Sequence, residues 1–424
     1  MTTTWAVLRD RNARLYLAGV LVSGFGTSAL WLAAGVWVKD LTGSDGLAAL
    51  SMLAMWAPTL AGPLLGALAD RIRRKPLLIG ANLLLAAVLP VLLTDRVAII
   101  LTVLFLYGAV GVVHDAAESA LVAGAVGPSL LGDFNGLRTA ITEGMKVIAP
   151  LAGAGLYALH GGPGVALLDA LTFVLAAGLY AGLRVRGTGP VRERGPESSS
   201  REQGPQPSGP EKEPAPSHRA PFTEGARHIW AHPTLRPLVL AGGTTMFCAG
   251  LNGALLYAVI DALGRSPAYA GALYAVQGAG SVAVGLFSGP ALRRLGGRRF
   301  AGYGIALTAV AAGLRALPSE PLALVCSAAI GAGLPCVLIA ALTAVQRETP
   351  DALLGRTVAT ANTLVFAPNV LGLAVGAALV ELVDQRPLSA VLGVLWLATA
   401  VPLFQRQASA ERIASRSPSD ANPA

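Results

Sequence analysis

The stretch GALADRIRRKPLL, residues 66–78, separates two apolar runs of the chain, 47–69 and 77–93. A run of about twenty apolar residues is long enough to cross a bilayer as one helix. The stretch is therefore expected to be a short loop between two membrane spans. Four basic residues follow Asp70 within five positions, and such a cluster is typical of cytoplasmic loops. Asp70 is an acid inside this basic cluster and adds nothing to the topology signal. We therefore expect Asp70 to have a separate role.

Apolar runs like these recur along all 424 residues. Charged residues make up 13% of the chain, against roughly 25% in soluble proteins, and the mean hydropathy is +0.59. The runs are continuous Ala, Leu, Gly and Val without the alternation of a membrane barrel. We therefore expect an all-α polytopic membrane protein with twelve transmembrane helices. The expected spans are 15–38, 47–69, 77–93, 97–124, 138–159, 164–183, 235–260, 269–290, 300–317, 321–345, 358–383 and 388–404.

The distribution of basic residues predicts the orientation of these spans. An even number of spans places both termini on one side of the membrane. The loops of the opposite side hold few basic residues, namely Lys39, Arg96, Arg265, Arg315 and Arg386. Both termini are therefore expected to be cytoplasmic. Topology accounts for the net charge of +8, so no nucleic-acid partner is expected.

The chain is expected to divide into two related halves. Residues 1–184 would form the first six-helix half and residues 221–404 the second, which opens with a short amphipathic helix. Residues 185–220 are rich in Pro, Gly, Ser and charge and predict a disordered cytoplasmic linker, and residues 405–424 form a cytoplasmic tail. RTAITEGMKVIAP (138–150) aligns with RTVATANTLVFAP (356–368), which indicates an internal repeat. Pro150 and Pro368 occupy equivalent places and permit helix bends.

The loop 66–78 resembles the signature of the major facilitator superfamily, G-x-L-A-D-R-x-G-R-K-x-x-L. Eight positions fit and Arg73 replaces the second glycine; the fitting residues are Gly66, Leu68, Ala69, Asp70, Arg71, Arg74, Lys75 and Leu78. With twelve spans in two halves, the resemblance covers nearly the whole chain. LTGSDGLAAL (41–50), EGARHIWAHPTLRPLVLAG (224–242) and APLAGAG (149–155) further resemble the macrolide-efflux-like, drug:proton antiporter branch.

This resemblance implies a conformational latch in the loop. Asp70 would approach the start of span eleven near Arg356 and Thr357, where free N–H groups attract a carboxylate. Arg74 would reach an acid at the inner end of span four. The latch, with Gly66 and Arg71, would hold the halves together when the protein opens outward. Alternatively, the basic residues serve only as a topology signal.

Charged residues also occur inside the spans. Span four carries His114, Asp115 and Glu118, and span five carries Glu143 and Lys146. Their positions predict similar depths on two antiparallel helices. Ionisable groups at such depths need partners: one acid can pair with Lys146 and another with Arg74. A remaining carboxylate, with His114, could carry protons.

A polar clamp without proton transfer is the alternative for this cluster. The second half has Ala361 and Leu364 in place of Glu143 and Lys146, so coupling is expected in the first half. Asp169, in span six, is a weaker candidate.

Polar and aromatic residues within the spans predict a substrate cavity, and contact with lipid or with other helices is the alternative for the aromatic ones. The candidates are Phe25, Trp31, Thr244, Asn252, Tyr257, Gln277 and Asn362. No G-x-x-x-x-G-K-[ST] motif and no zinc, triad or flavin motif occurs, so we expect neither an enzyme, nor a cofactor, nor a metal site. The three cysteines match no metal spacing.

The resemblance implies a secondary active transporter that exports an amphiphilic small molecule, a drug or secondary metabolite, by alternating access and proton antiport. The bias toward Arg over Lys and toward Ala, Gly and Leu is typical of a GC-rich bacterial genome, so we expect a bacterial plasma membrane. We also expect a monomer. Its partners would be the small-molecule substrate, protons and the lipid bilayer. Two alternatives stay open: an importer or facilitator of a small metabolite, and a non-transporting membrane scaffold or sensor.

Overall fold

The computed structural model describes residues 7–62, 64–65, 72–125, 131–184 and 220–404. All regular elements in these ranges are helical. The elements of the first half are α2 (Arg11–Thr42), α3 (Asp45–Trp56), η1 (Ala57–Ala61), α5 (Arg74–Val88), η2 (Leu89–Leu93), α6 (Val97–Ala125) and α7 (Leu131–Ala181). Those of the second half are α8 (Ala220–Ala231), α9 (Leu235–Ala254), α10 (Leu256–Ala262), η4 (Pro267–Tyr269), α11 (Ala270–Leu314), α12 (Glu320–Glu348), α13 (Asp351–Leu382) and α14 (Gln385–Ala398).

Eight described helices are long and apolar enough to cross a membrane, or nine if α9 and α10, bent by 43°, form one span. Two described elements, α7 and α11, are long enough for two crossings each. The 51 residues of α7 would extend about 77 Å, whereas a bilayer core is about 30 Å thick. The chain reverses within α7 at Gly161 (φ 66°) and within α11 at Gly296 (φ 74°), a backbone region that favours glycine. Each of these elements therefore consists of two antiparallel helical segments. The predicted all-α polytopic architecture is confirmed.

The turn LTGSD, residues 41–45, shows how the sequence sets a helix boundary. Gly43 ends α2 in the left-handed conformation, and its N–H donates to the Lys39 carbonyl at 2.8 Å. Ser44 then begins α3, because its hydroxyl accepts a hydrogen bond from the Leu47 N–H at 3.0 Å. This tight connection places Lys39, Ser44 and Gly46 at one end of the bundle.

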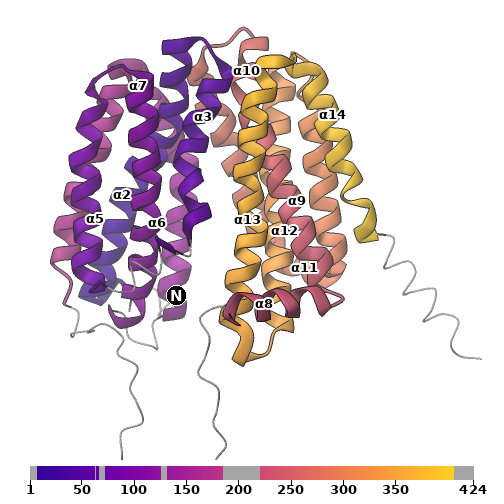
Figure 1. Cartoon of the computed structure of the whole chain (residues 1–424), viewed down its shortest axis with the longest axis horizontal. Helices are drawn as coiled ribbons and strands as arrows, with labels where there is room; N and C mark the ends of the chain where they lie inside the picture. Colours follow the sequence, from indigo (N-terminus) through magenta and orange to yellow (C-terminus); the bar gives the residue numbers. More distant parts are fainter. Residues whose placement is uncertain (1–6, 63, 66–71, 126–130, 185–219, 405–424) are drawn as a thin grey trace, which may run out of the picture.

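The helices form two bundles that stand side by side (Figure 1). One contains α2 to α7 and the other α9 to α14, each with its own apolar core. A further apolar cluster joins them, in which Val36 and Met52 of the first half pack with Leu256 and Leu273 of the second. In Figure 1 the bundles approach each other where α3 and α10 lie and diverge toward α8. We name these the Lys39 end and the α8 end.

Helix α8 lies across the foot of the second half (Figure 1). Its Glu224 forms an ion pair with Arg356 of α13. A β-carbon on Gly225 would lie 2.8 Å from the Arg356 carbonyl oxygen, so the two helices cross closely. These contacts fix α8 to α13.

Candidate functional site

A cavity of about 460 Å³ lies between the two halves. The first half supplies most of its wall from α2, α3, η1, α6 and α7, and α11 supplies the part from the second half. The residues that line it are Thr27, Ser28, Trp31, Met55, Trp56, Thr59, Tyr107, Gly108, Gly111, Val112, Asp115, Pro150, Tyr274, Gln277, Gly278 and Ser281. The wall is thus largely apolar and aromatic, with scattered hydroxyls, one amide and the carboxylate of Asp115. Such a composition suits a small molecule that is mostly apolar.

Two of the seven residues predicted for the cavity, Trp31 and Gln277, line it. Trp31 meets Tyr274 of the other half edge to face, with ring centroids 4.7 Å apart. The other five, Phe25, Thr244, Asn252, Tyr257 and Asn362, are not among the lining residues.

Their positions on the helices explain the difference. Tyr257 is 1% exposed, and its hydroxyl packs so near α2 that a β-carbon on Gly35 would meet it. Thr244 lines a separate cavity of about 320 Å³ with Thr399. Helices that are apolar on every side give no periodic signal for the face that turns inward.

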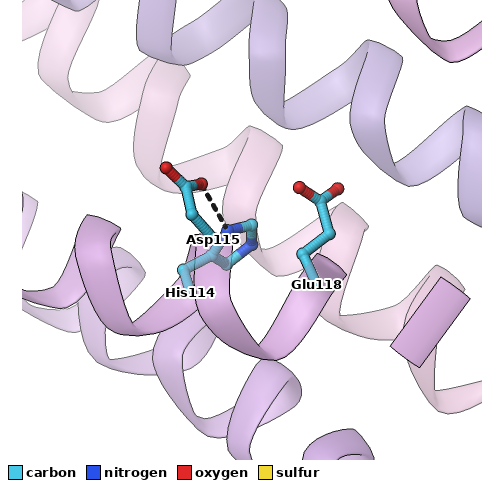
Figure 2. Close-up of side chains that lie close together, drawn as sticks. All are labelled: His114, Asp115 and Glu118. Carbon is cyan, nitrogen blue, oxygen red and sulfur yellow. Dashed lines mark ion pairs between the residues drawn. The ribbon is translucent and has the colours of Figure 1, made fainter. Parts of the chain in front are cut away.

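Three ionisable residues come together on α6. His114 and Glu118 share a face because they are four residues apart, and both are buried. Figure 2 shows the imidazole of His114 between the carboxylates of Asp115 and Glu118. His114 Nδ1 lies 3.6 Å from Asp115 Oδ1, and His114 Nε2 is buried without a hydrogen-bond partner. The side chain of Asp115 is 82% exposed and turns to the cavity.

Imidazole and carboxylate groups are ligands that divalent cations accept. One ligand atom from each residue of this cluster lies within 4.8 Å of the others. The cluster therefore has donors of the correct type to hold such an ion, although the sequence predicted no metal site.

Glu118 has a partner that the sequence did not suggest. Its Oε2 lies 3.3 Å from Arg138 Nη2, so the guanidinium of α7 balances this buried carboxylate. The expected partners were Lys146 and Arg74. The side chains of Glu143 and Lys146 lie outside the described residues, and their pairing stays a prediction.

The carboxylate of Asp169, in the second rod of α7, is fully buried. Its Oδ2 lies 3.0 Å from the hydroxyl of Tyr107, and its Oδ1 lies 3.1 Å from the hydroxyl of Thr172. The Tyr107 hydroxyl also lies 2.9 Å from Thr27 Oγ1. Tyr107 and Thr27 both line the cavity. The hydroxyl groups of these two residues therefore connect the buried Asp169 carboxylate to the cavity.

Ion pairs close the Lys39 end. Lys39 Nζ lies 2.8 Å from Asp45 Oδ1 in its own half and 2.6 Å from Asp261 Oδ2 in the other half. The Lys39 side chain is 7% exposed. One buried ammonium thus joins α2, α3 and α10.

A second connection at this end runs through Glu381 of α13. Its Oε1 accepts hydrogen bonds from the Ser44 hydroxyl at 2.5 Å and from the Gly46 N–H at 2.6 Å. A β-carbon on Gly46 would lie 2.7 Å from the Ala377 carbonyl oxygen, so α3 and α13 are in close contact here. The two halves are therefore joined at the Lys39 end by two separate sets of contacts.

Two helical bundles with a cavity between them are an architecture of secondary transporters. The family model of the Major Facilitator Superfamily matches residues 16–252 and 238–422. The chain belongs to this superfamily. It is therefore an integral membrane transporter and not an enzyme. No curated protein sequence matches it.

Solved structures share the major facilitator fold with this chain. A crystal structure of a bacterial homologue of the iron transporter ferroportin, in an inward-facing state, is 15% identical with a TM-score of 0.68, and the match covers 93% of this chain and 98% of that one. The nucleoside transporter NupG is 12% identical with a TM-score of 0.70, covering 93% and 98%. The POT family transporter PepTSo is 14% identical with a TM-score of 0.70, covering 95% and 99%. At these identities the likeness establishes the fold alone.

The loop that resembles the superfamily signature is described in part. Gly66, Asp70 and Arg71 lie outside the described residues, so the expected contact of Asp70 with span eleven stays a prediction. Arg74 begins α5, and Lys75 Nζ donates to the carbonyls of Ala181 at 2.8 Å and Leu183 at 2.7 Å. Lys75 thereby holds the last turn of α7, where free carbonyls attract a cation.

Proposed function

We propose that this transporter exports small amphiphilic molecules that carry a positive charge, in exchange for protons. The observation that carries the proposal is the composition of the cavity. Among the described residues that line it, Asp115 is the one with a full charge. The aromatic rings of Trp31, Trp56, Tyr107 and Tyr274 line the same cavity, and such rings attract both apolar groups and cations. A volume of about 460 Å³ lies within the range of sites for drug-sized molecules.

The route across the membrane would follow alternating access. The excess of basic residues in the predicted inner loops supports an orientation in which the Lys39 end faces outward. The ion pairs at that end then close the outer side, and the substrate enters from the cytoplasm or from the inner leaflet. Opening of the Lys39 end would release it outside.

If the transporter exchanges its substrate for protons, the substrate moves outward. Bacteria maintain a proton gradient directed inward, so an antiporter driven by it moves its other substrate outward. Acids inside the first half are the groups that such a mechanism needs. The resemblance of LTGSDGLAAL (41–50) and APLAGAG (149–155) to the drug:proton antiporter branch agrees with this direction.

Transport of a lipophilic cation tests the proposal. The purified protein in proteoliposomes, with an imposed pH gradient, should accumulate tetraphenylphosphonium. Asp115→Asn should reduce this accumulation by about ten-fold, the effect of losing one charge contact of roughly 1.4 kcal/mol. The control is Asp384→Asn, since Asp384 is exposed at the start of α14 and caps it with no side-chain hydrogen bond. Wild-type accumulation by Asp115→Asn would refute recognition of a cation by Asp115.

A divalent metal ion is a second candidate substrate, favoured by the donors of His114, Asp115 and Glu118. Two of the structurally similar proteins are described as an iron transporter homologue and as a bacterial metal transporter. Calorimetric titration with Mn²⁺ and Zn²⁺ distinguishes the candidates. Binding that is lost in His114→Ala but retained in His160→Ala, an exposed histidine, would favour the metal ion. Absence of binding would leave the amphiphilic cation.

A further inference from the structure

The surroundings of Asp169 give its carboxylate hydroxyl partners and no counter-charge. Its hydrogen bonds come from Tyr107 and Thr172, and no basic side chain is among its partners in the described part of the chain. On α2, the chain between Tyr16 and Lys39 has no titratable residue, and neither does 76–93 of α5 and η2. Among the described residues, Tyr107 is a titratable side chain that bonds to Asp169, and Asp115 is the next acid along α6. An ionised carboxylate buried without a cation is costly.

The hydroxyl of Tyr107 has one hydrogen but two oxygen neighbours. Asp169 Oδ2 lies at 3.0 Å and Thr27 Oγ1 at 2.9 Å. A hydroxyl donates one hydrogen bond and can accept others. If Asp169 is ionised, Tyr107 donates to it and accepts from Thr27. If Asp169 is protonated, it donates to Tyr107, and Tyr107 donates to Thr27. The same positions therefore accommodate both protonation states.

We propose that Asp169 carries the coupled proton and exchanges it with the cavity through Tyr107 and Thr27. A water in the cavity gives a proton to Thr27 Oγ1, and Thr27 passes its own hydrogen to the Tyr107 oxygen. Tyr107 in turn passes its hydrogen to Asp169 Oδ2. Each hydroxyl ends with one hydrogen, the acid becomes neutral, and the water is left as hydroxide or is reprotonated by the solvent. Release follows the same steps in reverse.

The packing of α2 on α7 keeps this chain of groups together. A β-carbon on Gly26, next to Thr27, would lie 2.2 Å from Asp169 Oδ1 and 2.3 Å from Thr172 Oγ1. Only a residue without a side chain permits this approach of the helices. The ring of Tyr107 also packs edge to face on Phe173, with centroids 5.9 Å apart. The close approach at Gly26 and the ring contact with Phe173 together hold the acid and the tyrosine beside Thr27.

This inference rests on the proposed proton exchange, and it explains how the substrate and the proton would influence each other. Asp115 and Thr27 line one cavity. A cationic substrate beside Asp115 raises the positive potential at Thr27 and opposes loading of a proton. A proton on Asp169 removes a negative charge near the cavity and weakens binding of a cation. The two cargoes therefore disfavour each other, which an antiporter requires.

Two transport measurements on Asp169→Asn test the proposal. Counterflow, the exchange of labelled for unlabelled tetraphenylphosphonium without a pH gradient, needs no proton and should persist. Accumulation driven by a pH gradient should fall by about ten-fold or more. Tyr157→Phe is the matched control for the tyrosine, because the Tyr157 hydroxyl donates to Asp40 and not to Asp169. Thermal unfolding of each variant shows whether it is folded.

Infrared difference spectra on a pH jump give a readout that needs no substrate. The wild type should show a protonated carboxylic acid band that Asp169→Asn removes. In Tyr107→Phe, which keeps the ring but breaks the route, the band should appear more slowly. Driven accumulation by Asp169→Asn at the wild-type level, or an unchanged band, overturns the assignment of Asp169. A band that appears at the normal rate in Tyr107→Phe overturns the route. If the wild type transports no tetraphenylphosphonium but the band behaves as expected, the proposed substrate fails and the proton site stands.

Discussion

The ammonium of Lys39, on α2, lies 2.6 Å from the carboxylate of Asp261, on α10, and so links the two halves of the transporter across its closed end. Lys39 also keeps Asp45 as a partner within its own half. Loss of Asp261 therefore removes this ion pair between the halves without leaving a buried lysine unpaired, while the hydrogen bonds of Glu381 remain. Substitution of Asp261 can therefore test how far this ion pair favours the state that is closed at the Lys39 end over the state that is open there.

Asp261→Asn should shift the protein toward a state open at the Lys39 end. The pair is half exposed on the Asp261 side, so we expect a loss of about 1 kcal/mol, or roughly a five-fold change in the ratio of the two states. Pulsed electron resonance between spin labels at Thr94 and Ser266, both exposed, measures the change. Glu320→Gln is the control, because Glu320 pairs with Arg265 within the second half. An equal shift in both variants would contradict a specific role for Asp261.

Gly46→Val should have a stronger effect than Asp261→Asn. A β-carbon at position 46 meets the Ala377 carbonyl and the Glu381 side chain, so α3 and α13 must separate. The variant should accumulate in the state open at the Lys39 end and show reduced transport. Gly62→Ala serves as the control, since nothing lies within 4 Å of an added β-carbon there. The same spin-label pair reports the result, and an unchanged distance distribution would show that the contact has no part in closure.

Arg138→Gln should lower the stability of the folded protein, because it leaves the buried carboxylate of Glu118 without its cation. Arg138 is 32% exposed, so we expect a loss of about 1–3 kcal/mol, below the range for fully buried pairs. The double variant Arg138→Gln with Glu118→Gln should recover most of it. Thermal unfolding in detergent measures both. A double variant as unstable as the sum of the single ones would mean that the residues act independently.

Glu224→Gln should loosen α8 from α13 without unfolding either bundle. Both partners of the Glu224–Arg356 pair are exposed by a third or more, so the global effect should stay within about 0.5 kcal/mol. Hydrogen exchange of the α8 amides should increase several-fold, since local opening needs only local contacts to break. Glu348→Gln, which affects the longer contact with His232 at 3.7 Å, should leave exchange in α8 nearly unchanged. Equal exchange in the two variants would contradict the anchoring role.

The sequence predicted the fold well, because the signals for it are long and repeated. The apolar runs, the repeated prolines at 150 and 368 and the loop motif can all be recognised in the sequence. None of them requires knowledge of how the helices pack. The cavity was harder to predict. Trp31 and Gln277 line it but Tyr257 does not, since the rotation of an apolar helix about its axis depends on its neighbours. Partners distant in sequence were also missed: Arg138 balances Glu118, and Arg315, expected in an outer loop, is buried and bonds to Ser327 at 2.6 Å.

The position of α11 in the cavity wall has a consequence for how such a transporter changes over time. Its residues there, Tyr274, Gln277, Gly278 and Ser281, are all uncharged, whereas the acids stand on α6 and α7 of the other bundle. Substitutions along this face of α11 alter the shape and polarity of the cavity that a substrate meets. They leave the charged groups of the first half unchanged. Selection for a new substrate can therefore act on α11 without changing the acids of the first half, which we propose to carry the coupled proton.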